Sequence, residues 1–159
     1  MTNVYLLLGS NLSDTFQQLE IAKKHIISRI GNMVEQSNLY CTAAWGITDQ
    51  PDFINQVITI STRYSPKIIL KKIIDIEKKM GRIRTEKNAP RIIDIDILFY
   101  NDEIVSSDDL IIPHPLLQFR RFVLIPLNEL APEFLHPVLH KTVGQLLAAC
   151  TDTLDVKRF

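Results

Sequence analysis

Residues 90–100, PRIIDIDILFY, are the stretch from which the fold can be predicted. Their β-branched and apolar content favours a strand over a helix. Because the side chains of a strand alternate between its two faces, we expect Asp94 and Asp96 to lie side by side on one face. The opposite face would then carry Ile93, Ile95, Ile97 and Phe99. Two neighbouring carboxylates repel each other unless a positive charge lies between them, so this strand requires cationic side chains or a metal ion nearby.

The positive charges lie just before this strand. Arg82, Arg84, Lys87 and Arg91 fall within ten residues, against a single acid, Glu86. Two carboxylates beside such a loop predict a site for Mg²⁺ bound to a polyphosphate, since Mg²⁺ takes one or two carboxylates and completes its shell with water and phosphate oxygens. Two such ions, about 3.5–4 Å apart, can share a carboxylate pair and promote in-line displacement at phosphorus. The alternative interpretation is a solvated sheet face with both carboxylates in water.

The segments before the aspartate strand alternate between strand and helix patterns. Hydrophobic periodicity predicts strands over 3–11, 33–43 and 53–63 and helices over 13–30 and 65–81, the first capped by Ser13 and the second by Ser65 with Pro66 in its first turn. The resulting βαββαβ order predicts an α+β fold with a ferredoxin-like core, in which helices pack on one face of a mainly antiparallel sheet.

A C-terminal extension follows this core. Residues 112–132 are punctuated by proline and are expected to hold short helical pieces, after a short strand around Ile104. Thr142 is expected to cap a short helix, and residues 154–159 to form an edge strand. No linker or repeat interrupts the sequence, so we expect one domain over residues 1–159.

Composition narrows the class of protein. The 159 residues are 46% hydrophobic and 23% charged, which is typical of a globular domain. The net charge is zero, so no nucleic-acid or membrane partner is expected, and any anion site must be a local cluster. Cys41 and Cys150 form neither a metal motif nor a disulfide framework. With no signal-peptide pattern and no apolar run long enough to span a bilayer, we expect a cytoplasmic protein.

Several motifs of phosphate and metal chemistry are absent from the sequence. It has no GxxxxGK[ST] loop, no protein-kinase motif set and no GxGxxG after the first strand, which argues against P-loop, kinase and Rossmann nucleotide sites. The four histidines lack the spacing of a zinc site. His136 and His140 are four positions apart, but Pro137 lies between them.

A series of short motifs carries a family resemblance along the whole chain. They are LLLGSNL at 6–12, DQPDFIN at 49–55, EKKMGRIR at 77–84, PRIIDIDIL at 90–98, IPHP at 112–115 and RRFVLIPLNELAPE at 120–133. In this order and spacing the chain resembles the 6-hydroxymethyl-7,8-dihydropterin pyrophosphokinase family of folate biosynthesis.

The resemblance implies a reaction and a set of phosphate-side residues. The β,γ-pyrophosphoryl group of ATP would pass to the hydroxymethyl oxygen of 6-hydroxymethyl-7,8-dihydropterin and leave AMP. Asp94 and Asp96 match the family's metal pair, which holds two Mg²⁺ ions, and with Arg82 and Arg91 they form the catalytic set. The nucleotide-binding positions, two of them in a mobile catalytic loop, are Glu77, Arg84, Lys87, Arg91, Ile97, His114 and Arg120. The enzyme is expected to be a monomer.

A site that binds the flat pterin ring requires apolar surfaces against the ring faces and hydrogen bonds in the plane of the ring. The amide of Asn55 offers both a donor and an acceptor to the pyrimidine edge of a pterin. Phe53 and Phe122 are expected to sandwich the ring. The wall between them would be formed by Thr42, Ala43, Ala44 and Trp45.

Two other functions remain open at this point. A palm-type nucleotidyl transferase or cyclase also carries two aspartates on a βαββαβ sheet, but it would release pyrophosphate, and a polymerase would need a wider basic surface. A small-ligand or metal-sensing module would explain the carboxylates and cations without any reaction, but not the separate set of Phe53, Asn55 and Phe122.

Overall fold

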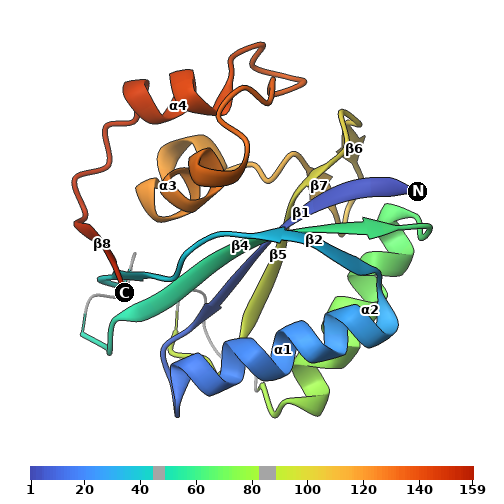
Figure 1. Ribbon diagram of the computed structural model, residues 1–159, viewed down its shortest axis with the longest axis vertical. Coiled ribbons are helices and arrows are strands. Elements are labelled where there is room, and N and C mark those ends of the chain that lie inside the picture. Colours follow the sequence, from blue (N-terminus) through green and yellow to red (C-terminus); the bar gives the residue numbers. More distant parts are fainter. Residues whose placement is uncertain (45–48, 83–88) are drawn as a thin grey trace.

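A computed structural model describes residues 1–44, 49–82 and 89–159 (Figure 1). The core elements are β1 (Thr2–Ser10), α1 (Thr15–Arg29), β2 (Asn32–Gln36), β3 (Tyr40–Thr42), β4 (Phe53–Thr62), α2 (Pro66–Lys79) and β5 (Asp94–Tyr100). The extension holds β6 (Val105–Ser106), β7 (Ile111–Ile112), the 3₁₀ helix η1 (Leu117–Phe119), α3 (Arg121–Leu130), α4 (Val143–Ala149) and β8 (Val156–Arg158). Within the described ranges no helix is both long and apolar enough to cross a membrane.

The main sheet has the strand order β5-β1-β4-β3-β8, with β2 also paired to β4. Every strand pair in the described part of the chain is antiparallel, which confirms the predicted core. The predicted strand over 33–43 is two strands instead of one. Between them the Ser37 hydroxyl accepts a hydrogen bond from the Val57 N–H, which would otherwise be available to the sheet ladder.

The prediction that the core helices pack on one face of the sheet is confirmed. Helices α1 and α2 lie on one face, and the extension places α3 and α4 on the other (Figure 1). The first interface buries Leu6, Leu8, Leu19, Ile26, Ile69 and Ile76. The second buries Leu7, Val57, Leu98, Leu124, Leu127 and Val143. A four-strand ferredoxin-like core by itself would leave the second apolar face of its sheet uncovered. The apolar stripe of the amphipathic α3 covers that face.

Strand β5 contains an irregularity that sequence periodicity does not reveal. Leu6 pairs with Ile97 but Tyr5 pairs with Phe99, so Leu98 is an extra residue in β5. As a result Phe99 packs with Leu98 in the α3-side core, whereas Ile95 and Ile97 pack in the α1/α2-side core. The expectation that Phe99 shares a face with Ile97 is therefore wrong, because a β-bulge reverses the alternation of side chains. Asp94 and Asp96 precede the bulge and stay on the α3 side.

The helix ends follow the predicted chemistry only in part. Ser65 lies at the N-cap of α2 with Pro66 after it, as predicted, but its side chain makes no capping hydrogen bond. The N-cap of α1 is Asp14 and not Ser13; its carboxylate accepts a hydrogen bond from the Gln17 N–H. Thr142 caps α4 as predicted, in a reciprocal capping box with Gln145. The edge strand β8 also forms as predicted, paired with β3.

Candidate active site

A cavity on the α3 side of the sheet collects most of the predicted site residues, and we call it the sheet-face cavity. Its lining residues are Leu7, Gly9, Thr42, Ala43, Phe53, Asn55, Arg91, Asp94, Asp96, Arg120 and Phe122. The cavity thus joins the expected metal pair to most of the expected pterin residues. Ala44 is buried beside the lining residue Ala43 but is not itself part of the wall. Trp45 lies outside the described residues.

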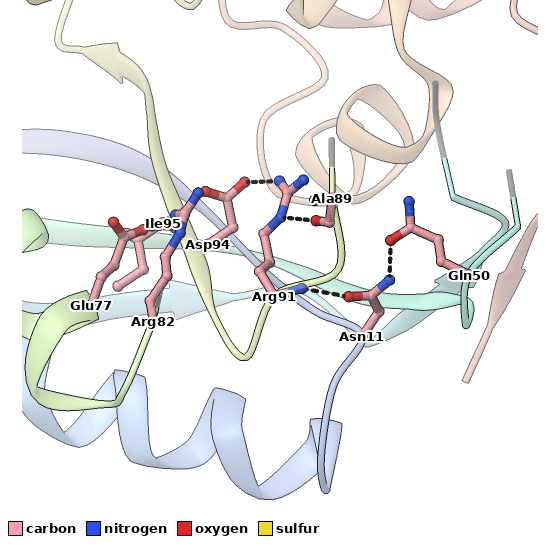
Figure 2. Close-up of polar contacts among 8 residues, drawn as sticks. All are labelled: Asn11, Gln50, Glu77, Arg82, Ala89, Arg91, Asp94 and Ile95. Atoms are coloured by element: carbon pink, nitrogen blue, oxygen red, sulfur yellow. Dashed lines mark hydrogen bonds and ion pairs between the residues drawn. The ribbon is translucent and has the colours of Figure 1, made fainter. Parts of the chain in front are cut away.

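Two arginines neutralise Asp94 (Figure 2). Arg82 Nη1 donates to Asp94 Oδ1 and to Glu77 Oε2, both at 2.7 Å, and Arg91 Nη1 donates to Asp94 Oδ2 at 3.2 Å. Glu77 is buried, and its Oε2 also accepts a hydrogen bond from the Ile95 N–H. The required positive charges thus come from the chain itself. Glu77, expected on the nucleotide side, joins α2 to β5 and orients Arg82.

The two aspartates have opposite acid–base character. Burial by itself would raise the pKa of Asp94, but the adjacent charges of Arg82 and Arg91 outweigh it and lower the pKa. Burial raises the pKa of Asp96 well above its usual value, and the negative charges of Asp94 and Glu77 add to the effect. Ionisation is thus favoured at Asp94 and opposed at Asp96.

This donor set fits Mg²⁺. The described residues contain no cluster of three or more His, Cys, Asp or Glu side chains that would hold a metal by themselves. A carboxylate pair open to a cavity suits Mg²⁺, which keeps water and phosphate oxygens in the rest of its shell. Asp96, whose burial opposes ionisation, is the carboxylate that would gain most from a divalent cation.

A second cavity lies along β5, which is the terminal strand of the sheet, and we call it the edge cavity. It is lined by Leu70, Ile73, Ile95, Asp96, Ile97, Asp108, Asp109, Leu110, Ile111, His114 and Pro115. The predicted nucleotide residues Ile97 and His114 are among them. Asp96 lines both cavities. Sequence reasoning missed the contribution of residues 108–111, because the β6–β7 segment reads as an unremarkable polar loop. Arg84 and Lys87 lie outside the described residues.

Asn55 is a buried polar residue in the lining of the sheet-face cavity. Only 3% of the residue is exposed, and its Nδ2 finds no hydrogen-bond partner among the described residues. Gly9 is its partner across the β1–β4 ladder. A Cβ atom at Gly9 would lie 2.6 Å from Asn55 Oδ1, so glycine leaves the room that the amide occupies.

Replacing Gly9 with alanine is expected to weaken pterin binding about tenfold, because the displaced amide loses a hydrogen bond of about 1–1.5 kcal/mol. Calorimetric titration with the pterin would measure this. Gly144→Ala is the control, since its added Cβ meets nothing closer than 3.4 Å. Equal pterin affinity of Gly9→Ala and the unmodified chain would contradict the assignment of Asn55.

Asn11 joins two segments that border the site. Its Nδ2 donates to Gln50 Oε1 at 2.7 Å, and its Oδ1 accepts from the Arg91 N–H at 2.9 Å (Figure 2). The same Nδ2 also donates to the Pro51 carbonyl at 2.9 Å. Asn11 is 2% exposed. The side chain therefore fixes the start of the Arg91 segment relative to the segment before Phe53. Sequence reasoning did not single out Asn11, since its partners are as many as 80 positions away.

His114 is held neutral at the edge cavity. Burial, followed by the positive charge of Arg120, lowers the pKa of His114 to about 4. Its Nδ1 accepts a hydrogen bond from the Leu116 N–H at 3.1 Å, which protonation at Nδ1 would abolish. His114 is therefore available as an uncharged hydrogen-bonding group at neutral pH.

This pKa predicts an acid-sensitive contribution to stability. Between pH 6.5, the usual histidine pKa, and about 4, the unfolded chain binds a proton that the folded chain does not. The free energy of unfolding should therefore fall by up to about 3 kcal/mol as the pH drops through this window. Urea unfolding of the unmodified chain and of His114→Asn, which keeps an acceptor oxygen, would isolate the effect. Parallel pH profiles of the two proteins would contradict it.

The fold and the two cavities define an α+β protein with a carboxylate–arginine centre between two cavities that share Asp96. The sequence model of the family described as 7,8-dihydro-6-hydroxymethylpterin-pyrophosphokinase (HPPK) matches residues 5–132. The 2-amino-4-hydroxy-6-hydroxymethyldihydropteridine pyrophosphokinase of Methylorubrum extorquens is 40% identical over 149 residues, which cover 93% of each chain. The chain therefore belongs to the HPPK family, whose members are pyrophosphokinases.

Other relatives are much longer than this chain. The folic acid synthesis protein FOL1 of Dictyostelium discoideum is 43% identical over 148 residues, which span 90% of this chain but 22% of FOL1. The corresponding Schizosaccharomyces pombe protein is also 43% identical, with 20% of its length covered. The wild-type HPPK-DHPS structure of Plasmodium falciparum with pteroate superposes with a TM-score of 0.76 at 19% identity, over 92% of this chain and 42% of that one. This superposition supports the fold.

Proposed function

We propose that the chain transfers the β,γ-pyrophosphoryl group of ATP to the hydroxymethyl oxygen of 6-hydroxymethyl-7,8-dihydropterin, giving AMP and the pterin diphosphate in folate biosynthesis. Membership of the HPPK family supports the reaction class. The observation that carries the proposal is the position of Asp96, which lines both the sheet-face cavity and the edge cavity. A group at the junction of two hollows can act where two substrates meet.

The pterin is proposed to occupy the sheet-face cavity. The unsatisfied Nδ2 and the carbonyl oxygen of Asn55 would bind the pyrimidine edge of the ring. Phe53 and Phe122 would cover its two faces, and each ring already lies beside a guanidinium, Arg91 at 5.3 Å and Arg120 at 5.7 Å from the ring centroids. This placement would direct the hydroxymethyl group toward the aspartate pair.

ATP is proposed to occupy the edge cavity with its phosphates toward Asp96. Ile97 would pack against the nucleotide, and His114 would offer it an uncharged hydrogen-bonding group. Arg82, Arg91 and Arg120 would bind phosphate oxygens, which suit the planar guanidinium. For Arg84 and Lys87 the proposal of a contact with ATP rests on the family resemblance alone.

Asp94 and Asp96 would hold the proposed two Mg²⁺ ions. When bound, Mg²⁺ would neutralise phosphate charge and lower the pKa of the pterin hydroxyl. The hydroxymethyl oxygen attacks the β-phosphorus, the bond from that phosphorus to the α,β-bridging oxygen breaks, and AMP leaves with this oxygen. The hydroxyl proton passes to water. Arg82 and Arg91, which neutralise Asp94 in the described structure, stabilise the charge on the transferring phosphates.

The nucleotide product tests this proposal. The chain is incubated with ATP and Mg²⁺, with and without 6-hydroxymethyl-7,8-dihydropterin, and the nucleotides are separated by chromatography. The proposal predicts AMP only when the pterin is present, and no reaction after chelation of the metal. ADP would indicate a simple kinase, and free pyrophosphate a nucleotidyl transferase.

The proposal includes a monomeric enzyme in the cytoplasm that acts on small molecules and uses neither nucleic acid nor a membrane. The zero net charge of the sequence supports the absence of a polyanionic partner. Light scattering during size-exclusion chromatography tests the monomer, since a dimer would elute with twice the mass of the chain.

A further inference from the structure

We propose that residues 152–158 act as a clamp that fixes two walls of the sheet-face cavity, with Asp152 as a positioning residue. The inference rests on the proposed function, because that proposal assigns the pterin to this cavity. The two walls come from distant parts of the sequence. One is the end of β3, with Thr42 and Ala43, and the other is the start of α3, with Arg120 and Phe122.

The α3 wall depends on a cap supplied by this segment. The N-cap position of α3 is Arg120, and an arginine side chain has no hydrogen-bond acceptor. The first turn also has no acidic residue. Instead, Asp152 Oδ2 accepts a hydrogen bond from the Arg121 N–H at 3.1 Å, from 31 positions further along the chain. The Asp152 carboxylate therefore stabilises the helix turn that carries Phe122.

The clamp is itself ordered by the same carboxylate. Asp152 Oδ1 accepts a hydrogen bond from the Leu154 N–H at 3.0 Å, so one side chain both caps α3 and fixes the turn that leads into β8. Asp152 also lies near enough to Arg120 to favour its charged form. The carboxylate thus supports the first turn of α3, which carries the cavity residue Phe122, without lining the cavity itself.

The β3 wall is held by the other end of the clamp. The Thr42 hydroxyl donates to the Asp155 carbonyl at 3.2 Å, and Thr42 pairs with Val156 in the β3–β8 ladder. Further along, the Arg158 guanidinium donates to Asn38 Oδ1 at 2.9 Å, and the Asn38 amide donates to the Glu129 carboxylate of α3. The contacts through Asn38 therefore connect β8 back to α3, and β3, β8 and α3 are linked to one another.

Substitution of Asp152 by alanine tests the clamp. We expect the KM for the pterin and its dissociation constant to rise about tenfold, since small displacements of positioning groups have large effects on binding and rate. The KM for ATP and kcat at saturating pterin should change by less than about threefold, because Asp152 contacts neither substrate nor phosphate. Asp152→Asn keeps one acceptor oxygen and should recover part of the pterin affinity.

Asp155→Ala is the matched control. It removes a carboxylate from the same segment, but that carboxylate is three-quarters exposed, and the backbone carbonyl that Thr42 binds remains. Pterin affinity of Asp152→Ala equal to that of the control would overturn the clamp. So would equal losses for the pterin and ATP, which a general loss of folding would produce. If the unmodified chain neither binds the pterin nor forms AMP, the proposed function fails, and the clamp fails with it.

Discussion

Asp96→Asn is expected to lower kcat by about 10³-fold or more while leaving pterin affinity within about threefold of the unmodified value. Asparagine keeps the size of the side chain but cannot supply the charge that a divalent cation requires, and that cation accounts for several kcal/mol of transition-state stabilisation. The proposed pterin contacts of Asn55 and Phe53 do not involve Asp96. Turnover is measured as AMP release, and pterin binding is measured by calorimetry.

The control for this prediction is Asp102→Asn, which removes an exposed carboxylate outside both cavities. Its kcat and pterin affinity should equal those of the unmodified chain. Two results would contradict the role of Asp96. One is turnover within tenfold of normal, and the other is a loss of pterin affinity as large as the loss of turnover.

Arg82→Met is expected to lower the free energy of unfolding by about 3 kcal/mol. Arg82 is 13% exposed and bonds both Asp94 and Glu77, so methionine preserves packing volume but removes a cation that two carboxylates share. Urea unfolding in magnesium-free buffer measures the loss. The same substitution should lower turnover, because Arg82 is proposed to bind the transferring phosphates.

A double-mutant cycle separates charge from packing in this prediction. Glu77→Gln removes one of the two carboxylates that Arg82 bonds while keeping an acceptor oxygen for the Ile95 N–H. In the double variant, Glu77→Gln should recover more than about 1 kcal/mol of the unfolding free energy that Arg82→Met removes, as expected for coupled buried charges. Strict additivity of the two substitutions would show that the ion pair contributes little to stability.

The sequence predicts the core fold because each of its segments has a clear local period. The β-branched runs of β4 and β5 and the apolar stripe of α2 lie in the predicted places, and the chain order of these elements then defines the topology. The aspartate pair was predictable for the same reason. Alternation along a strand puts Asp94 and Asp96 on one face. The repulsion between their carboxylates requires positive charges nearby, and the preceding segment is rich in arginine and lysine.

The features that local patterns do not encode were missed. The bulge at Leu98 is a feature of the register between β5 and β1, and no residue type in DIDILFY marks it. Asn11 and Asp152 act through backbone groups 80 and 31 positions away, so no local pattern reveals their partners. The role of Gly9 follows from its register with Asn55, which requires knowledge of the strand pairing. Such long-range contacts become visible only in the folded structure.

The central claim is attack at the β-phosphorus of ATP, and the fate of the α,β-bridging oxygen tests it most directly. ATP labelled with ¹⁸O at that bridge is incubated with the chain, Mg²⁺ and 6-hydroxymethyl-7,8-dihydropterin, and the products are analysed by mass spectrometry. The account predicts that all of the label is in AMP and none is in the pterin diphosphate. Label in free pyrophosphate or in ADP would place the attack at the α- or γ-phosphorus and contradict the account.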